Sequence, residues 1–246
     1  MLNVLLLVAF GYLLGSVPSG WLVMKVYRNQ DLRKLGSGNI GAANVFRAGG
    51  PGAFALTLIS DGLKGFIPVM LGIAFGLGGN ELALAAIGLA AVVGHNWPLY
   101  LGFHGGKGVA TSGGVLLALA PVAIVLALLT WFLVIRITRV ASVASLSAVA
   151  VGFVSLIVLH LVGWQAWRPV GWSVVVLGVI LAALILVRHR INIERLATGR
   201  ELKITAHSCR NDRQPRRPCG SFSLVRARSA RCSAHGWPRK EARSPS

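Results

Sequence analysis

Long apolar runs separated by short polar junctions dominate this chain as far as residue 203. The runs cover residues 2–27, 53–77, 82–94, 109–135, 140–162 and 170–187. A helix needs about 20 apolar residues to cross the hydrocarbon core of a bilayer, so runs of this length predict membrane-spanning helices. The pattern therefore predicts an all-α, polytopic membrane protein.

The run over residues 109–135 decides the topology, because Arg136 and Arg139 follow it. Basic residues favour the cytoplasmic ends of spans, and a single helix here would place both arginines outside. Splitting the run at Pro121 gives two segments of about 13 residues, each about 20 Å long and therefore short or re-entrant in a bilayer. The split puts the junction 164–168 outside and predicts about seven membrane helices, with the N-terminus outside and the C-terminus cytoplasmic.

Composition agrees with a membrane protein and changes the interpretation of the charge. The chain is 54% hydrophobic and 13% charged, whereas soluble domains carry about 25% charged residues. A net charge of +18 would normally suggest nucleic acid as a partner, but ten Lys and Arg against two Asp and Glu after Lys203 supply +8 of it. Most of the remainder lies at the ends of apolar runs, so we predict no nucleic acid partner.

The last part of the chain differs in composition from everything before it. Residues 204–246 are rich in Arg, Ser and Pro and poor in aliphatic residues, which predicts a disordered tail that can bind anionic lipid head groups weakly. We therefore divide the chain into a membrane domain, residues 1–203, and a basic tail, residues 204–246. All three cysteines lie in the tail, so no disulfide is predicted in the membrane domain.

A glycine-rich junction over residues 35–52 forms the first of three polar clusters on the predicted cytoplasmic face. It carries Ser37, Asn39, Asn44 and Arg47 between six glycines. Glycine lets a ligand approach the backbone closely. Exposed N–H groups, a hydroxyl, amides and a guanidinium together suit an oxyanion such as phosphate.

The other two clusters lie at residues 94–111 and 188–196. In the first, Lys107 stands among glycines, but Leu101 and Gly108 occupy positions where a nucleotide-binding phosphate loop needs Gly and Ser or Thr. Lys107 remains a candidate anion ligand. In the second, His189 and Asn192 lie one helical turn apart on one face. Since the three clusters contain almost no carboxylates, they do not fit a glycosidase or a Ca²⁺ or Mg²⁺ site.

Asp61 and Lys64 lie within an apolar run, one helical turn apart. Charges at that depth are costly, and they are usually paired or functional. A buried structural ion pair and a catalytic role both stay open for them.

Six motifs lie at these clusters and in the helices beside them: Gly-Ser-Val-Pro-Ser-Gly at 15–20, Gly-Ser-Gly-Asn-Ile-Gly-Ala-Ala-Asn-Val-Phe-Arg at 36–47, Asp-Gly-Leu-Lys-Gly at 61–65, Gly-His-Asn-Trp-Pro at 94–98, Gly-Gly-Lys-Gly-Val-Ala-Thr at 105–111 and Arg-His-Arg-Ile-Asn-Ile-Glu-Arg-Leu at 188–196. In these motifs, from about residue 10 to residue 203, the chain resembles the bacterial acyl-phosphate:glycerol-3-phosphate acyltransferases, the PlsY family.

The resemblance implies a multi-pass enzyme of the bacterial cell membrane, with seven membrane helices and active-site loops on the cytoplasmic face. Such an enzyme would transfer a fatty acyl group from acyl phosphate to the 1-hydroxyl of sn-glycerol 3-phosphate. The products would be lysophosphatidic acid and phosphate, in the first step of bacterial phospholipid synthesis. The resemblance implies no cofactor and no metal. Its expected partners are both substrates, membrane lipids and a functionally coupled soluble enzyme that forms acyl phosphate.

The resemblance also assigns site residues by motif. The catalytic positions would be Ser37, Arg47, Lys107, His189 and Asn192. The substrate-binding positions would be Gly38, Asn39, Gly41, Asn44, Gly105 and Gly106. The chain departs from the family pattern at Ala43, where Thr is usual, at Trp97, where Phe is usual, and at His104, where Lys is common. The last departure removes a fixed positive charge near Lys107.

Two other classes of protein remain as alternatives. A transporter for anions or phosphate esters would need polar residues that continue to the outer face, where the predicted loops carry only Glu81 and Arg168 as charges. A lipid-binding scaffold without catalysis would not need Ser, Asn, Lys and His clustered among glycines. An assay for acyl transfer separates both alternatives from an enzyme.

Overall fold

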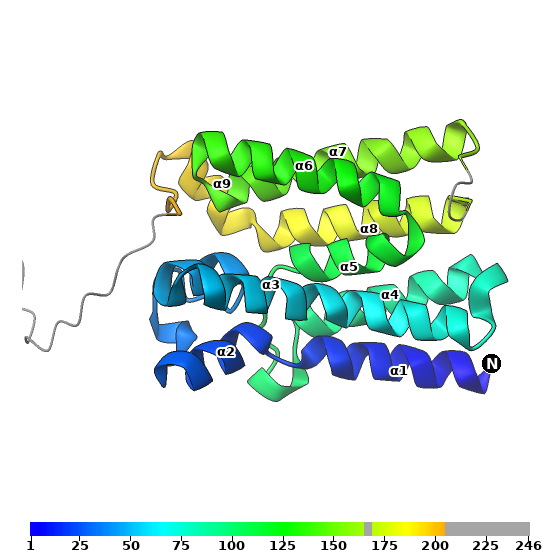
Figure 1. Ribbon diagram of the computed structural model, residues 1–246, viewed down its shortest axis with the longest axis horizontal. Helices are drawn as coiled ribbons and strands as arrows, with labels where there is room; N and C mark the ends of the chain where they lie inside the picture. Colours follow the sequence, from blue (N-terminus) through cyan, green and yellow to red (C-terminus); the bar gives the residue numbers. More distant parts are fainter. Residues whose placement is uncertain (165–168, 205–246) are drawn as a thin grey trace, which may run out of the picture. The chain divides into compact units, whose positions relative to one another are not determined.

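The computed structural model describes residues 1–164 and 169–204 of the 246-residue chain. Within them, all regular structure is helical. The α-helices are α1 (Leu2–Ser16), α2 (Ser19–Arg28), α3 (Ala42–Ala74), α4 (Glu81–Asn96), α5 (Val109–Leu119), α6 (Pro121–Thr138), α7 (Ala141–Leu161), α8 (Trp172–Arg188) and α9 (Arg190–Ala197). Short 3-10 helices lie at η1 (Leu32–Lys34), η2 (Leu77–Gly79) and η3 (Leu99–Leu101). Figure 1 shows the longer helices side by side along the longest axis.

The helix lengths are those of a polytopic membrane protein. Within the described residues, five segments are long and apolar enough to cross a membrane: Leu2–Arg28, Ala42–Ala74, Glu81–Leu101, Pro121–Thr138 and Ala141–Leu161. The pair α8 and α9, bent by 58°, supplies a sixth, and α5 is a shorter apolar helix. The prediction of an all-α membrane bundle that includes a short helix is therefore confirmed.

The chain breaks at Pro121 as predicted, but the two halves differ in length. α5 has 11 residues and α6 has 18, which correspond to about 16 Å and about 27 Å. The prediction that both halves are short is wrong for α6, because this helix continues past Arg136 to Thr138. A long arginine side chain near a helix end can carry its charge to water, so the apolar run ends before the helix does.

The apolar run at the N-terminus is divided in a similar way at Pro18. α1 ends at Ser16 and α2 begins at Ser19. Proline has no backbone N–H and its ring clashes with the preceding turn, so a continuous helix is disfavoured here. Pro18 thus divides this apolar run into two helices.

The glycine-rich junction is shorter than the predicted loop over residues 35–52, which is a correction. α3 already begins at Ala42, and Gly50 interrupts it with φ 82° and ψ −172°. The intervening residues contain no proline and form helical turns, while Pro51 suits the first turn of the helix that follows. Asn44 and Arg47 therefore project from a helix rather than from a flexible loop.

Glycines allow very close approach between helices in the first half of the chain. A Cβ atom at Gly15 would lie 2.1 Å from the carbonyl oxygen of Ala91, and one at Gly94 would lie 2.2 Å from that of Tyr12. Small residues at helix interfaces permit such packing in membranes, where van der Waals contact drives association. This packing fixes the C-terminal end of α4 against α1.

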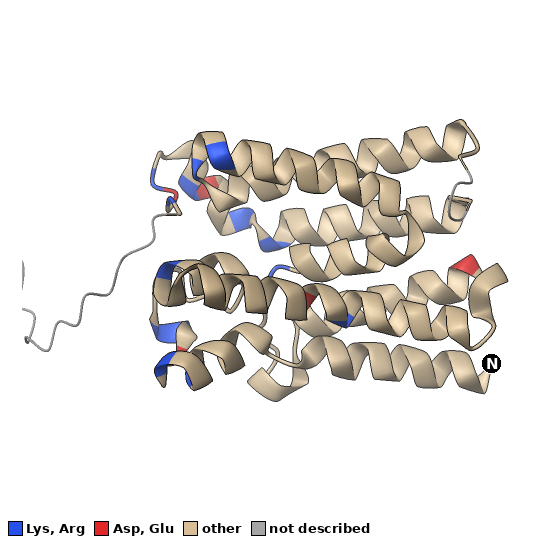
Figure 2. Ribbon diagram, in the orientation of Figure 1, with Lys and Arg blue, Asp and Glu red and all other residues tan. Residues whose placement is uncertain are grey.

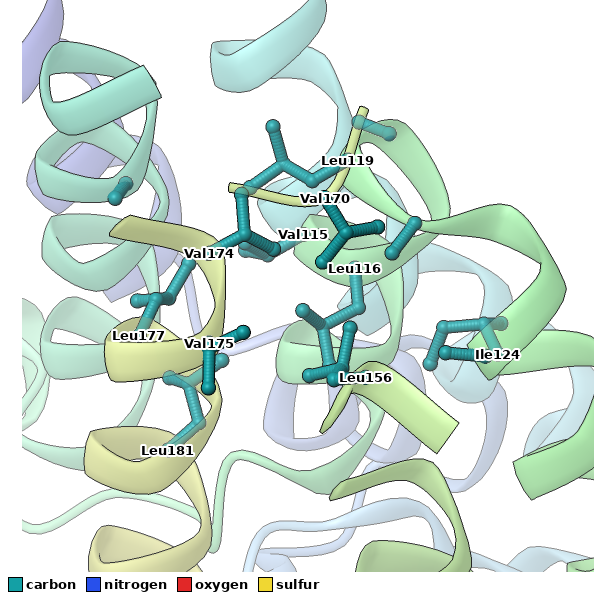
Figure 3. Packing of buried hydrophobic residues seen from close by; sticks show 14 of the residues in the cluster. Val115, Leu116, Leu119, Ile124, Leu156, Val170, Val174, Val175, Leu177 and Leu181 are labelled. Carbon is teal, nitrogen blue, oxygen red and sulfur yellow. The ribbon is translucent and has the colours of Figure 1, made fainter. Parts of the chain in front are cut away.

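Aliphatic side chains from α3 to α8 form the main core. Figure 3 shows Leu116 and Leu119 of α5, Leu156 of α7 and Leu177 and Leu181 of α8 packed together. All five are buried. The core holds α8 in place, and thereby the bend that follows Arg188.

Charged residues are unevenly distributed over the described part of the bundle. Figure 2 shows Lys and Arg gathered at the end where α2 and α9 lie, and an acidic residue near the opposite end. This asymmetry is the one that the positive-inside rule describes for a cytoplasmic end. The predicted tail from residue 205 onward and most of the junction 164–168 lie outside the described residues.

Candidate active site

A large cavity brings together most of the predicted site residues. Its volume is about 580 Å³, and its walls come from the loop before α3 and from α3, α5, α6, α7, α8 and α9. The predicted site residues that line it are Ser37, Asn39, Gly41, Asn44, Arg47, Lys107, His189 and Asn192. Most of the remaining wall is apolar and includes Leu128, Trp131, Phe132, Leu156 and Leu181. The cavity thus joins a polar end to an apolar compartment.

The Asn44 side chain shapes the loop that carries Ser37. Its Oδ1 accepts a hydrogen bond from the Ser37 backbone N–H at 3.0 Å, and its Nδ2 donates to the carbonyls of Leu35 and Asn39, each at 2.9 Å. The Asn39 Oδ1 accepts from the Gly41 N–H at 2.8 Å. The Asn44 amide and the Asn39 side-chain oxygen are occupied by the backbone of their own loop, so these groups hold its shape instead of binding a ligand.

Arg47 reaches from the first turns of α3 to the segment after α9. Its guanidinium donates to the carbonyl of Leu202 at 3.1 Å and to that of Lys203 at 3.3 Å. The side chain of Arg47 is half-buried and lines the cavity. A positive charge with fixed direction therefore stands at the polar end.

Lys107 lies in the loop between η3 and α5 and donates through Nζ to the Asn192 Oδ1. Burial lowers the pKa of Lys107 to about 8, and the negative charge of Glu201 opposes that decrease. Desolvation disfavours an ammonium, so a lysine in this position favours a bound anion. Lys107 is the second cation at the polar end.

His189 lies at the bend between α8 and α9 and is buried. Its Nδ1 is 2.8 Å from the Ile185 carbonyl oxygen. Because a carbonyl oxygen can only accept, Nδ1 carries the proton in this contact. In the neutral ring, Nε2 is then left as a hydrogen-bond acceptor.

Two residues beyond the predicted set complete the polar end. The Glu201 Oε1 accepts from the Asn192 Nδ2 at 2.6 Å and from the Ser142 Oγ at 2.8 Å. Ser142 stands at the start of α7 in a run of small residues, and Glu201 lies four residues after the end of α9. The only feature of the sequence that points to Glu201 is that it is an acidic residue just after the basic segment 188–200. No feature of the sequence points to Ser142.

Three predicted substrate-binding glycines do not line the cavity: Gly38, Gly105 and Gly106. A Cβ atom at Gly106 would lie 2.1 Å from the His95 Nε2, and one at Gly105 would lie 2.2 Å from the His95 carbonyl oxygen. Gly105 and Gly106 therefore permit close packing of their loop against α4. His104, beside them, is exposed, and its Nδ1 is 2.6 Å from the Gly102 carbonyl oxygen.

Asp61 and Lys64 form a buried ion pair at the floor of the polar end. The Lys64 Nζ lies 2.7 Å from the Asp61 Oδ1, and the Ser19 Oγ donates to the same oxygen. The His95 Nδ1 lies 3.6 Å from it. Asp61 and His95 also line the cavity, so the pair both holds α2, α3 and α4 together and borders the site.

Within residues 1–164 and 169–204, no group of three His, Cys, Asp or Glu side chains is arranged to hold a metal ion. The polar end offers three cations (Arg47, Lys107 and Arg195), hydroxyls, amides, backbone groups and imidazoles, beside the carboxylates of Asp61 and Glu201, which already have hydrogen-bond partners. Such a set can bind anions, and the adjoining apolar compartment can take a hydrocarbon chain.

Known proteins resemble this chain in sequence and in fold. The family model described as glycerol-3-phosphate acyltransferase matches residues 5–199. A glycerol-3-phosphate acyltransferase of Rubrobacter xylanophilus is 47% identical over 208 residues, which cover 85% of this chain and 98% of the relative. One of Syntrophomonas wolfei is 41% identical over 195 residues, with coverage of 79% and 93%.

Solved structures agree with these relatives. The crystal structure of PlsY (YgiH), an integral membrane glycerol 3-phosphate acyltransferase, in its glycerol 3-phosphate form matches with a TM-score of 0.73 and 41% identity, over 82% of this chain and 95% of that one. The lysophosphatidic acid form of PlsY matches with a TM-score of 0.71 and 40% identity over the same shares. With a family model over residues 5–199 and relatives above 40% identity across nearly their whole length, the chain belongs to the glycerol-3-phosphate acyltransferase family.

Proposed function

We propose that this protein transfers a fatty acyl group from acyl phosphate to the 1-hydroxyl of sn-glycerol 3-phosphate and releases lysophosphatidic acid and phosphate. The observation that carries the proposal is the single cavity that joins a cationic end to an apolar compartment. A substrate pair with two phosphate groups and one hydrocarbon chain matches both parts of this cavity.

At the polar end, Arg47 and Lys107 hold the phosphate groups of the two substrates. Arg47 can bind a phosphate through two parallel N–H groups, whereas Lys107 acts as a compact charge. Ser37 and Asn192 orient the attacking hydroxyl or the donor phosphate. Gly41, which lines the cavity, lets the backbone of the loop approach a phosphate. These roles follow from the family motifs and from the position of Arg47 and Lys107 on the same cavity.

The reaction needs little more than positioning and charge stabilisation. Acyl phosphate is an activated mixed anhydride, so the 1-hydroxyl oxygen forms a bond to the acyl carbon while the bond from that carbon to the phosphate oxygen breaks. Phosphate leaves with the bonding electrons. The hydroxyl proton passes to a substrate phosphate or to the His189 Nε2, which is an acceptor in the neutral ring. Oriented binding and a fixed cationic site supply most of the rate enhancement.

The apolar compartment takes the acyl chain. Its walls come from α3, α5, α6, α7 and α8, with Trp131, Phe132, Leu156 and Leu181 among the side chains. Some of these side chains, such as Phe132, are partly exposed on the lipid-facing surface of the bundle. The donor can therefore enter from the bilayer, in which an acyl phosphate made by a coupled soluble enzyme would dissolve.

The membrane orientation is part of the proposal. We place the polar end of the cavity at the cytoplasmic face of the cell membrane, because Lys and Arg gather at that end of the described bundle. The N-terminus is then outside and the C-terminus inside. Glycerol 3-phosphate reaches the site from the cytoplasm.

The test of the proposal compares acyl donors. Purified protein in detergent is mixed with glycerol 3-phosphate and either palmitoyl phosphate or palmitoyl-CoA, and lysophosphatidate and inorganic phosphate are measured. We expect phosphate release that requires glycerol 3-phosphate, with no turnover of the thioester. Turnover of palmitoyl-CoA would overturn the acyl phosphate assignment, and no product from either donor in folded protein would overturn the enzyme assignment.

A further inference from the structure

We propose that Arg188 is a positioning residue that holds the Lys107 loop, residues 102–108, in the geometry that the transfer requires. The inference rests on the proposed function, because it concerns the cationic end of the same cavity. Arg188 does not line that cavity. It would act through the backbone of the loop.

The Arg188 guanidinium bonds to two consecutive carbonyls of the loop. Its Nη2 donates to the Gly105 carbonyl oxygen at 2.8 Å and to the Gly106 carbonyl oxygen at 2.8 Å, and its Nε donates to Gly106 at 2.9 Å. A planar guanidinium presents these donors in a fixed fork, so it restricts both the position and the direction of the two peptide groups.

The loop has a second support on its other side. The Gly106 N–H donates to the His95 carbonyl oxygen at 3.0 Å, and Gly106 is packed against the His95 ring. The peptide units before and after Gly106 are thus fixed from α4 and from α8 at once. Arg188 is itself held, since its guanidinium lies 5.5 Å from the centre of the Trp97 ring, at a distance typical of cation–π contacts.

The loop, α8 and α9 form a closed frame around the polar end. Arg188 at the end of α8 bonds to Gly105 and Gly106. Lys107, which follows Gly106 in the loop, donates to Asn192 on α9. Since α8 and α9 are bent by 58° at His189, these two connections also fix the bend. Loss of Arg188 would leave the bend and the loop joined mainly by the contact between Lys107 and Asn192.

Lysine cannot replace arginine in this frame. Its ammonium is a single point on a flexible stem, so it cannot hold two neighbouring carbonyls in one plane. An error of about 1 Å in the position of a catalytic group can reduce the rate about hundredfold. We therefore expect Arg188→Ala to raise the KM for glycerol 3-phosphate about tenfold to hundredfold, with a smaller increase in Arg188→Lys.

The first measurement does not depend on activity. Hydrogen exchange of the peptide that contains residues 102–108 is compared in wild-type protein and in Arg188→Ala, without substrate. The positioning role predicts faster exchange in this loop and unchanged exchange in α7. Arg190→Ala is the matched control, because it removes an exposed arginine from the same bend and should leave both exchange and KM unchanged.

The second measurement uses the pH dependence of kcat/KM. The charged groups that act on Lys107 are Glu201, which raises its pKa, and Arg47, Arg195 and Arg188, which lower it along with burial. Removing the Arg188 charge should therefore move the alkaline limb of the profile to higher pH. Greater exposure of Lys107 to water would shift the limb in the same direction, so the conservative variant separates loss of the charge from loss of packing. Arg188→Lys, which keeps the charge, should leave the limb in place and serves as the test if Arg188→Ala does not fold.

The proposal is overturned if Arg188→Ala and Arg188→Lys both keep wild-type exchange in the loop and wild-type KM for glycerol 3-phosphate. An inactive wild-type protein would instead overturn the proposed function, and the exchange measurement would still test the contact between Arg188 and the loop.

Discussion

Two features of the Lys107 environment disfavour its positive charge: the side chain is largely removed from water, and several other cations stand near it. Burial lowers its pKa to about 8, so the ammonium is present below that pH and is lost as the pH rises through it. We expect kcat/KM for glycerol 3-phosphate to fall above about pH 8. Steady-state rates between pH 6 and pH 10 check this, because kcat/KM reports groups of the free enzyme and free substrate.

The control for the pH profile is a permanent charge at the same place. In Lys107→Arg, the guanidinium stays protonated over the whole range, so the alkaline limb should disappear even where the overall rate is lower. An alkaline limb that is identical in Lys107→Arg and wild type would assign the titration to another group.

Gly106 offers a second prediction on the scale of one residue. A Cβ atom there would lie 2.1 Å from the His95 Nε2 and 2.8 Å from its Cε1, and the His95 ring is buried, with little room to move. Gly106→Ala should therefore displace the loop and raise the KM for glycerol 3-phosphate about tenfold. Gly52→Ala is the control, because nothing lies within 4 Å of its Cβ position. Equal KM values in the two variants would contradict the packing role.

The sequence identifies most of the residues that line the site, but it does not show which of their groups bond to one another. Motifs select Asn44 and Arg47 equally as polar residues among glycines, whereas only the structure shows that the amide is used by its own loop and that the guanidinium borders the cavity. Ser142 and Glu201 could not be found, because a contact across 59 residues leaves no local spacing pattern.

At the scale of helices, prolines and glycines divide the apolar runs. The sequence predicts the break at Pro121, and the break at Pro18 has the same cause, the missing N–H of proline. The start of α3 at Ala42 could not be predicted in the same way. The many glycines of the junction lower its helix propensity, although a short helical stretch there extends to Gly50. Breaks caused by covalent geometry are thus predictable, whereas a helix stabilised by its contacts is not.

The buried ion pair of α3, which Ser19 of α2 and His95 of α4 approach, leads to a prediction at this scale. Asp61→Ala leaves the Lys64 ammonium without its carboxylate partner and removes the acceptor of the Ser19 hydroxyl. Breaking a buried ion pair from one side costs about 3–5 kcal/mol of stability. Thermal unfolding in detergent should show a clear decrease in midpoint.

A double variant controls for the cavity left at Asp61. Asp61→Ala combined with Lys64→Met removes both charges, so it should recover much of the lost stability. If Asp61→Ala alone unfolds at the wild-type temperature, the pair does not stabilise the contact between these helices.

For the whole molecule, the distribution of Lys and Arg in Figure 2 predicts the orientation in the membrane. The three native cysteines, Cys209, Cys219 and Cys232, follow the last helix, so in intact cells they should not react with a membrane-impermeant maleimide. Gly79→Cys, in the turn η2 at the opposite end, should react after the native cysteines are replaced. The reverse labelling pattern would contradict a cytoplasmic C-terminus.

The central claim is that the cationic end of the cavity is the site of acyl transfer from acyl phosphate. The most direct measurement is the rate of lysophosphatidate formation from palmitoyl phosphate and glycerol 3-phosphate by Arg47→Ala, beside Lys34→Ala as a control for an exposed cation. We expect Arg47→Ala to lose at least about a hundredfold in rate, as removal of a group that stabilises transition-state charge does, while it elutes as folded protein and Lys34→Ala keeps the wild-type rate. Full activity in a folded Arg47→Ala variant would show that transfer takes place elsewhere.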